Sequence, residues 1–376
     1  MPINSGLAQI SNVLLVLAIV LYALAMLAYA CDFAFGRRKA PASSSASARV
    51  PELVGAGAPV GLDDDAGQAF PADPADLSEL ADLNGRAVGP AGAAGAAGPV
   101  GGAGDLFGLR GMPARPSQQP RWPVGVWLRG AFLLTCAGLA VHMGAILTRG
   151  LAEHRPPWGN MYEFIAAFTA MAVLVLTVAA VRFRAYYMGL FVLLPVVLAL
   201  AVDVVVIYTP AGELVPALQS YWLAIHVTGM LISIGMYIFG AVVTVLFLMV
   251  ARHERRVSAG LESRSAGIMA QLPGSAVLDR LAYRAILFAF PAWTFAVIAG
   301  AIWADHAWGR YWGWDPKETW SFITWLVYAS FLHARATTGW RGRRAAYIQL
   351  VGFTCLIFNL VGVNLWITGL HSYAGL

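Results

Sequence analysis

Charged side chains are scarce in this chain, and their scarcity excludes an ordinary soluble fold. Asp, Glu, Lys and Arg make up 12% of the 376 residues, while hydrophobic residues make up 59%. A typical globular domain is about 25% charged. The composition instead predicts an all-α polytopic membrane protein, whose helices carry the apolar residues across the hydrocarbon core.

Cysteine is also rare. The three cysteines, Cys31, Cys136 and Cys355, lie in or beside apolar stretches, and no two of them form a Cys-x-x-Cys pair. The chain is therefore not expected to be a dithiol carrier. We interpret all three as small apolar packing residues.

Long apolar stretches, in contrast, are abundant. Eight of them reach the roughly 20 residues that a helix needs to cross a hydrocarbon core about 30 Å thick. They lie near 7–30, 124–148, 160–181, 186–208, 221–250, 283–303, 320–336 and 346–367. The first lacks the basic start and small-residue cleavage site of a signal peptide, so we expect it to be retained. The sequence thus predicts about eight transmembrane helices.

Basic residues gather in four of the connections between these stretches. They are Arg37, Arg38 and Lys39; Arg182 and Arg184; Arg252, Arg255 and Arg256; and Arg341, Arg343 and Arg344. Lys and Arg accumulate in short loops on the cytoplasmic side, so both termini and the connection 304–320 are predicted to be extracytoplasmic. The same clusters account for the net charge of +5, so no nucleic-acid partner is expected.

Residues 40–121 interrupt the membrane pattern. They are rich in Ala, Gly, Pro and Ser and carry no periodic apolar face. Such a segment buries too little surface to offset the entropy of ordering, so a disordered cytoplasmic linker is predicted. It would separate an N-terminal transmembrane helix, 1–39, from a membrane domain, 122–376.

The connection near 304–320 is short, polar and strongly aromatic. It contains the sequence Trp-Gly-Arg-Tyr-Trp-Gly-Trp-Asp-Pro-Lys-Glu-Thr-Trp over 308–320. Trp and Tyr favour the membrane boundary and offer flat apolar faces, so we expect the segment to cover a large planar ligand such as a porphyrin. Asp315, followed by Pro316 and Glu318, has the pattern of a helix N-cap.

Three of the seven histidines are candidate haem ligands. His226 and His371 lie at the predicted outer ends of two helices, where two facing imidazoles would form the axial pair of a haem iron. The alternative is that each only forms hydrogen bonds at the interface. His333 lies thirteen residues beyond Trp320, about 20 Å further inward at helical rise, and cannot join that pair. An ionisable side chain at such depth suggests a function. His142 is interpreted as a packed hydrogen-bonding residue.

The aromatic segment, followed by Ser-Phe-Ile-Thr-Trp, resembles the tryptophan-rich WWD signature of the haem-handling proteins of cytochrome c biogenesis. Within them it is similar to the CcsA (ResC) family of the two-component pathway, system II. The similarity extends through Trp-Leu-Ala-Ile-His226-Val, His333 and Gly-Leu-His371-Ser-Tyr. The related CcmC and CcmF families share the segment but differ in helix number and length. The resemblance implies these haem-covering residues: Trp308, Gly309, Tyr311, Trp312, Trp314, Asp315, Glu318 and Trp320.

The resemblance also implies a function. A protein of this family would lie in the plasma membrane of a bacterium, convey haem b across it, and present the haem outside to apocytochrome c for thioether attachment at Cys-x-x-Cys-His. His226 and His371 would be the outer axial ligands, and His333 an intramembrane ligand opposed by a ResB-like partner. We therefore expect a subunit of a cytochrome c synthase, supported by thiol-reducing proteins, with no catalytic residue assigned.

Two other functions fit part of the sequence. A haem exporter or chaperone without a direct part in attachment would need the same ligands. A general solute permease with an aromatic-lined pocket explains the helices, but it does not explain the paired outer histidines.

Overall fold

The computed structural model describes residues 3–36, 123, 125–213, 218–263, 267–337 and 340–371. The predicted linker 40–121 lies outside these residues. Every regular element in the described part is a helix. The elements are α1 (Ser5–Phe35), α2 (Val126–Glu153), α3 (Met161–Phe183), η2 (Tyr186–Met188), α4 (Gly189–Val205), α5 (Tyr221–Ser258), η4 (Ile268–Gln271), α6 (Ser275–Trp308), α7 (Pro316–Ala336), α8 (Arg343–Ile357), η5 (Phe358–Gly362) and α9 (Val363–Trp366).

Seven helices in the described ranges are long and apolar enough to cross a membrane. They are α1, α2, α3, η2 with α4, α5, α6, and the continuous helix from α8 through η5 to α9. The prediction of an all-α polytopic membrane protein is therefore confirmed. The eighth predicted span corresponds to α7, which has 21 residues but is less apolar. Its crossing, and the side on which the termini lie, stay predictions.

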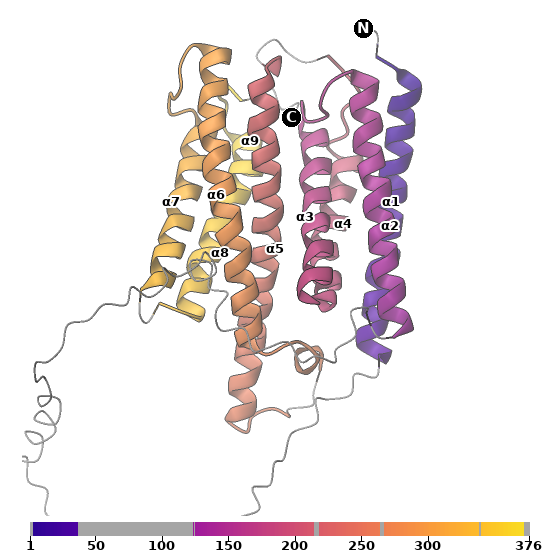
Figure 1. The fold of residues 1–376 in the computed structure, drawn as a ribbon, viewed down its shortest axis with the longest axis vertical. Helices are drawn as coiled ribbons and strands as arrows, with labels where there is room; N and C mark the ends of the chain where they lie inside the picture. The colour runs from indigo at the N-terminus through magenta and orange to yellow at the C-terminus, as the bar shows by residue number, and fades with distance from the viewer. Residues whose placement is uncertain are drawn as a thin grey trace, which may run out of the picture. The chain divides into compact units, whose positions relative to one another are not determined.

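The helices pack as two neighbouring groups that α3 joins (Figure 1). α1 lies along α2 and also contacts α4, while α5 packs against α6 and α8, and α7 against α8 and α6. α3 contacts α2 and α4 on one side and α5 on the other. α3 begins at Met161, which lines the pocket described below.

Tyrosine side chains hold α1 against its neighbours. The rings of Tyr22 and Tyr29 are almost completely buried. A Cβ atom on Gly138 of α2 would lie only 2.6 Å from the Tyr22 ring, so the absence of a side chain there lets the two helices approach closely. Ser11 adds a hydrogen bond of 2.8 Å to the Ala145 carbonyl. α1 is thus an integral part of the described bundle.

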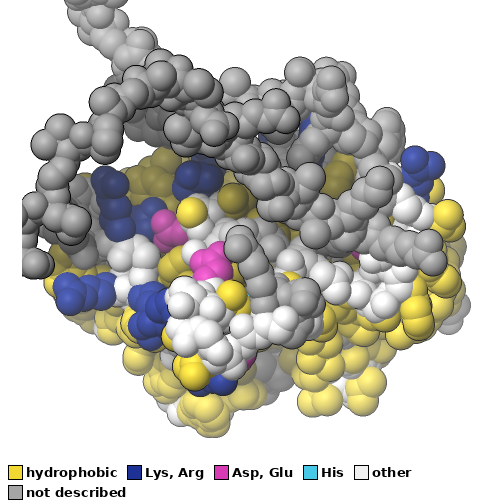
Figure 2. All heavy atoms as spheres, turned by 90° about the horizontal axis from the view of Figure 1, so that it is seen from below, with side chains coloured by type: hydrophobic (Ala, Val, Ile, Leu, Met, Phe, Trp, Pro, Cys, Tyr) yellow, Lys and Arg dark blue, Asp and Glu magenta, His cyan; other side chains and the backbone are white. Residues whose placement is uncertain are grey.

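Basic side chains gather at one end of the bundle. The connections after α3, α5 and α7 lie at this end (Figure 1), which Figure 2 shows from below, with Lys and Arg in dark blue among hydrophobic side chains. The Arg284 guanidinium, in the first half of α6, lies 5.7 Å from the centroid of the Phe183 ring, the last residue of α3. The N-terminal part of α6 therefore lies at the same end of the bundle as the C-terminus of α3. Of the four predicted basic clusters, 37–39 lies outside the described residues. This arrangement agrees with a common side for the other three.

Candidate functional site

A pocket lies between α3, α5, α6, α7 and the segment that joins α6 to α7. The space between its walls, together with the adjoining open solvent, is about 1080 Å³. Most of its lining is apolar or aromatic, and the few polar groups come from different elements. The side chains discussed below that line it are Trp158, Asn160, His226, Trp303, Tyr311, Trp312, Lys317, Glu318 and His371.

His226 lies in the second turn of α5 with its ring fixed against α6. Its Nδ1 is 2.7 Å from the carbonyl oxygen of Ala296. Because a carbonyl can only accept, Nδ1 carries the proton and donates it, and the lone pair resides on Nε2. A Cβ atom at Gly300 would lie 2.5 Å from His226 Nδ1, so only glycine leaves room for this ring position. The tautomer is the one that a metal-binding imidazole needs.

Trp303 connects His226 and His371. Its ring stacks on that of His226, with the centroids 5.9 Å apart and the planes 14° apart. It also meets the edge of the His371 ring at 5.6 Å and 64°. Sequence reasoning missed this residue because it ends the apolar stretch 283–303. Trp303 follows Gly300 by three residues, so the two lie on the same face of α6. That spacing was the one sequence feature that could have placed Trp303 beside His226.

His371 is brought to the pocket by the chain that follows α9. Its Nδ1 donates a hydrogen bond of 2.7 Å to Oδ2 of Asp315, which again leaves the lone pair on Nε2. The ring also meets Trp308 edge to face, with the centroids 5.0 Å apart. The structure therefore brings together the two histidines that the sequence placed at one membrane face.

Asp315 has two functions in this geometry. As the N-cap of α7, the Asp315 side chain accepts a hydrogen bond from the Lys317 backbone N–H. The Glu318 side chain accepts one from the backbone N–H of Asp315, and together these bonds confirm the predicted cap. Its other oxygen accepts from the Leu370 N–H at 2.7 Å, beside the bond from His371. Burial raises the carboxyl pKa of Asp315, but these hydrogen bonds outweigh burial and hold the pKa below its ordinary value. The carboxylate is thus ionised where it holds His371.

Glu318 shapes the turn that precedes α7. Its Oε2 accepts from the Gly313 N–H at 2.8 Å, and its Oε1 lies 3.2 Å from the Arg310 guanidinium. That guanidinium lies 6.0 Å from the Trp308 ring centroid. Arg310 is therefore held by Glu318 rather than directed into the pocket, whereas Lys317 lines the pocket.

The aromatic segment begins as part of a helix, which the apolar stretch 283–303 did not predict. α6 continues to Trp308, and α7 starts at Pro316 as the predicted Asp315 cap requires, so the turn itself is 309–315. Gly309 ends α6 with a φ of +70°, a left-handed conformation that favours glycine. The helices extend past the apolar stretches because hydrogen bonding, not hydropathy, decides where a helix ends.

The aromatic residues of this segment differ in position. Tyr311 and Trp312 line the pocket. Trp314 is 66% exposed and has a positive φ of 57°, with its ring edge against Trp312 at 5.7 Å. Trp320 packs on Phe358 at 4.3 Å, between α7 and η5. Within the described residues, Trp308, Trp314 and Trp320 do not line the pocket, so only part of the predicted set borders it.

The structure places His333 apart from the pocket, near the other end of α7. Its side chain is exposed, and its backbone carbonyl accepts from the Thr337 N–H. Nearby, Arg335 pairs with Asp279 of α6 at 2.8 Å and fixes this end of α7. His142 is completely buried with Nδ1 3.3 Å from the Tyr22 hydroxyl, which confirms its interpretation as a packed hydrogen-bonding residue.

Comparisons with known proteins agree with this arrangement. The family described as "Cytochrome C assembly protein" matches residues 158–371, which include the complete pocket lining. A protein of Guillardia theta named "Cytochrome c biogenesis protein CcsA" is 35% identical over 263 residues, covering 66% of this chain and 85% of the relative. A protein of the same name from Gloeobacter violaceus is 36% identical over 281 residues, covering 62% and 82%.

The helical bundle and the matched region define a membrane protein of the cytochrome c assembly class. Within that class, the chain belongs to the CcsA family.

Proposed function

We propose that this protein acts in cytochrome c biogenesis by binding haem as its substrate between His226 and His371 and presenting it to apocytochrome c. Membership of the CcsA family supports the pathway. The observation that carries the haem assignment is the pair of imidazoles, both with Nδ1 donating and both in contact with Trp303. Imidazole Nε2 is the usual protein ligand of a haem iron.

The rest of the pocket fits haem b by its chemistry. Aromatic rings offer flat apolar faces to a porphyrin, and Lys317 supplies a cation for a propionate. This assignment differs from the alternative that each histidine only hydrogen-bonds at the interface. That alternative also predicts the two Nδ1 hydrogen bonds, but it does not require both rings to border one pocket.

The protein's contribution to attachment would be positioning and protection. A cysteine thiol adds across a haem vinyl group, so that sulfur bonds to one vinyl carbon and the thiol hydrogen goes to the other, with no net oxidation. Two imidazoles would hold the haem in a fixed place during this approach. The substrate's own histidine would then displace one of them. Reduced cysteines would be maintained by thiol-reducing proteins.

His333 supports a second haem position. Its side chain is exposed near the far end of α7, so an opposing ligand would come from a ResB-like partner rather than from the described residues of this chain. Haem would be received there and would move to the outer pocket, in the plasma membrane of a bacterium with the active face extracytoplasmic. The haem exporter or chaperone alternative is favoured by this same separation of His333 from the pocket.

The test is haem binding by the purified complex with its ResB-like partner. His226→Ala and His371→Ala are each expected to lose the low-spin spectrum of a bis-imidazole haem. His306→Ala is the matched control, because His306 is an exposed histidine in the last turn of α6 that does not line the described pocket. Unchanged haem content and spectra in both pocket variants would refute the assignment. Reconstitution with haem and an apocytochrome peptide tests the exporter alternative, which predicts that thioethers form without this chain.

A further inference from the structure

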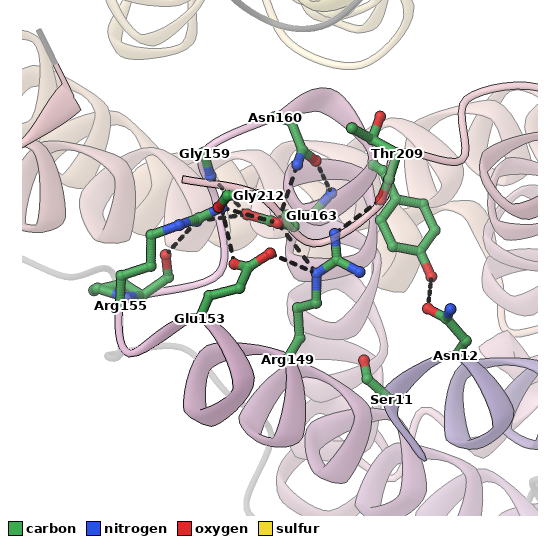
Figure 3. A network of polar contacts seen from close by, with 12 residues as sticks. Ser11, Asn12, Arg149, Glu153, Arg155, Gly159, Asn160, Glu163, Thr209 and Gly212 are labelled. Atoms are coloured by element: carbon green, nitrogen blue, oxygen red, sulfur yellow. Dashed lines mark hydrogen bonds and ion pairs between the residues drawn. The ribbon is translucent and has the colours of Figure 1, made fainter. Parts of the chain in front are cut away.

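Four charged side chains are buried together where α2 ends and α3 begins (Figure 3). They are Arg149, Glu153, Arg155 and Glu163, and none of these side chains is more than 11% exposed. Glu153 lies 2.9 Å from Arg149 and 2.8 Å from Arg155. Glu163 contacts both arginines as well, at 3.2 Å and 2.8 Å. Burying ion pairs costs about as much in desolvation as their attraction returns, so the cluster is not expected to add much stability. Its importance depends instead on which segments of the chain its hydrogen bonds connect.

Glu163 reaches beyond the cluster to the wall of the pocket. Besides the arginines, it accepts hydrogen bonds from the Gly159 N–H at 2.9 Å and from Asn160 Nδ2 at 3.0 Å. Gly159 and Asn160 both line the pocket. Asn160 Oδ1 in turn accepts from the Glu163 N–H and caps α3. Figure 3 shows these bonds converging on one carboxylate.

The two arginines tie a second connection to the same carboxylate. Arg149 donates to the Thr209 carbonyl at 2.8 Å, and Arg155 donates to the Gly212 carbonyl at 3.3 Å. Both acceptors belong to the chain that follows α4. The cluster therefore fixes the segment before α3 and the segment after α4 relative to one another.

The wall held by Glu163 touches the histidine site through aromatic packing. Trp158, next to Gly159, lines the pocket and packs in one apolar cluster with Leu223, Val227 and Trp303. Trp303 stacks on His226. A shift of the wall would therefore move the rings that border His226.

We propose that Glu163 is a positioning residue for the pocket: its carboxylate holds the wall of residues 158–160 against the Trp303 and His226 stack. This inference rests on the proposed function, since it concerns the fit of the pocket to haem. Glu163 is not assigned contact with the haem.

The experiment compares Glu163→Gln with Glu153→Gln in the purified complex. Glutamine keeps the size of either side chain, but at 163 its Nε2 must face donors that the carboxylate accepted. The Glu153 carboxyl contacts both arginines and Glu163 but, in the described structure, no pocket-lining residue, so Glu153→Gln perturbs the cluster without removing a bond to the pocket wall and is the matched control. Readouts are the haem dissociation constant, the ligand-sensitive absorption spectrum and the melting temperature.

Glu163→Gln is expected to weaken haem binding by on the order of tenfold to a hundredfold, as misplaced binding groups do, and to alter the spectrum. Glu153→Gln is expected to lower the melting temperature while keeping the wild-type spectrum and haem affinity. Equal effects of the two variants on haem, or no effect of either, would overturn the proposal.

Asn160→Ser provides a second measurement if Glu163→Gln does not fold. Serine retains the N-cap but removes the Nδ2 donor to Glu163, so a smaller spectral change in the same direction is expected, and a wild-type spectrum would count against the proposal. Parallel measurement of His226→Ala separates the two hypotheses. If that variant keeps the wild-type haem content and spectrum, the proposed function fails; if it loses the haem bound between His226 and His371 while Glu163→Gln matches Glu153→Gln, only the positioning role fails.

Discussion

Replacing Asp315 by asparagine tests how the protein holds His371 beside His226. The carboxylate accepts two bonds of 2.7 Å, from the Leu370 N–H and from His371 Nδ1. An asparagine has one acceptor oxygen and one amide group that only donates. The two donors bond to different oxygens of the carboxylate, so an asparagine in the same position can accept from only one of them.

The expected consequence is a change of tautomer at His371. If the oxygen of the introduced asparagine keeps the Leu370 bond, its amide faces Nδ1, and His371 satisfies it by moving its proton to Nε2. A protonated Nε2 cannot ligate iron. Loss of a carboxylate that orients a metal-binding histidine typically costs 10- to 100-fold in affinity, or about 1.4–2.8 kcal/mol. We expect a loss of haem affinity of about this size.

The assay is haem titration of the purified complex, monitored by absorption, alongside thermal unfolding. Asp315→Ala is the companion variant. Asparagine caps helices as well as aspartate does, whereas alanine loses about 1 kcal/mol of capping. Because the Lys317 N–H and His371 Nδ1 bond to the same Asp315 oxygen, an amide at that place also weakens the cap. Asp315→Asn should therefore lose haem affinity and at most the roughly 1 kcal/mol of capping that Asp315→Ala loses. If Asp315→Asn binds haem like the wild type and only Asp315→Ala is impaired, Asp315 serves as a cap alone and the reasoning is refuted.

Three further predictions concern neighbouring features. Gly300→Ala is expected to displace the His226 ring, because the added Cβ would lie 2.5 Å from Nδ1, and to abolish the bis-imidazole spectrum; a wild-type spectrum would contradict the ring position. Gly138→Val is expected to lower stability by about 1–3 kcal/mol through overpacking on Tyr22, measured by thermal unfolding, with the haem spectrum of the folded fraction unchanged. The pKa of Asp315 is lower in the folded protein than in the unfolded chain, where it is about 3.9. The ionised carboxylate therefore stabilises the folded state fully above that unfolded pKa, and this stabilisation is lost as the pH falls through the pKa of the folded state. Acid should thus release haem from the wild type more steeply than from Asp315→Asn, and equal pH profiles would contradict this.

The sequence predicted the helices because the thickness of the hydrocarbon core sets a length that apolar stretches reveal. It also predicted that His226 and His371 share one end of the bundle, since orientation follows from the basic clusters. It did not reveal the hydrogen bond that His371 donates to Asp315, whose partners are 56 residues apart. Trp303 was hidden because a tryptophan at the end of an apolar stretch has the appearance of a packing residue. Contacts between distant segments leave no periodic signal in one sequence.

The same limit applies to the acidic residues of the aromatic segment, because a capping pattern does not show which further groups they bind. Asp315 and Glu318 have the pattern of a capping box, and they form one. Yet each has bonding capacity beyond the cap: Asp315 uses it for His371 and Leu370, and Glu318 uses it for Gly313 and Arg310. One capping box therefore starts α7, closes the aromatic turn and sets the tautomer of a candidate ligand. The aromatic rings supply the surface of the pocket, but the two carboxylates determine where that surface and His371 lie.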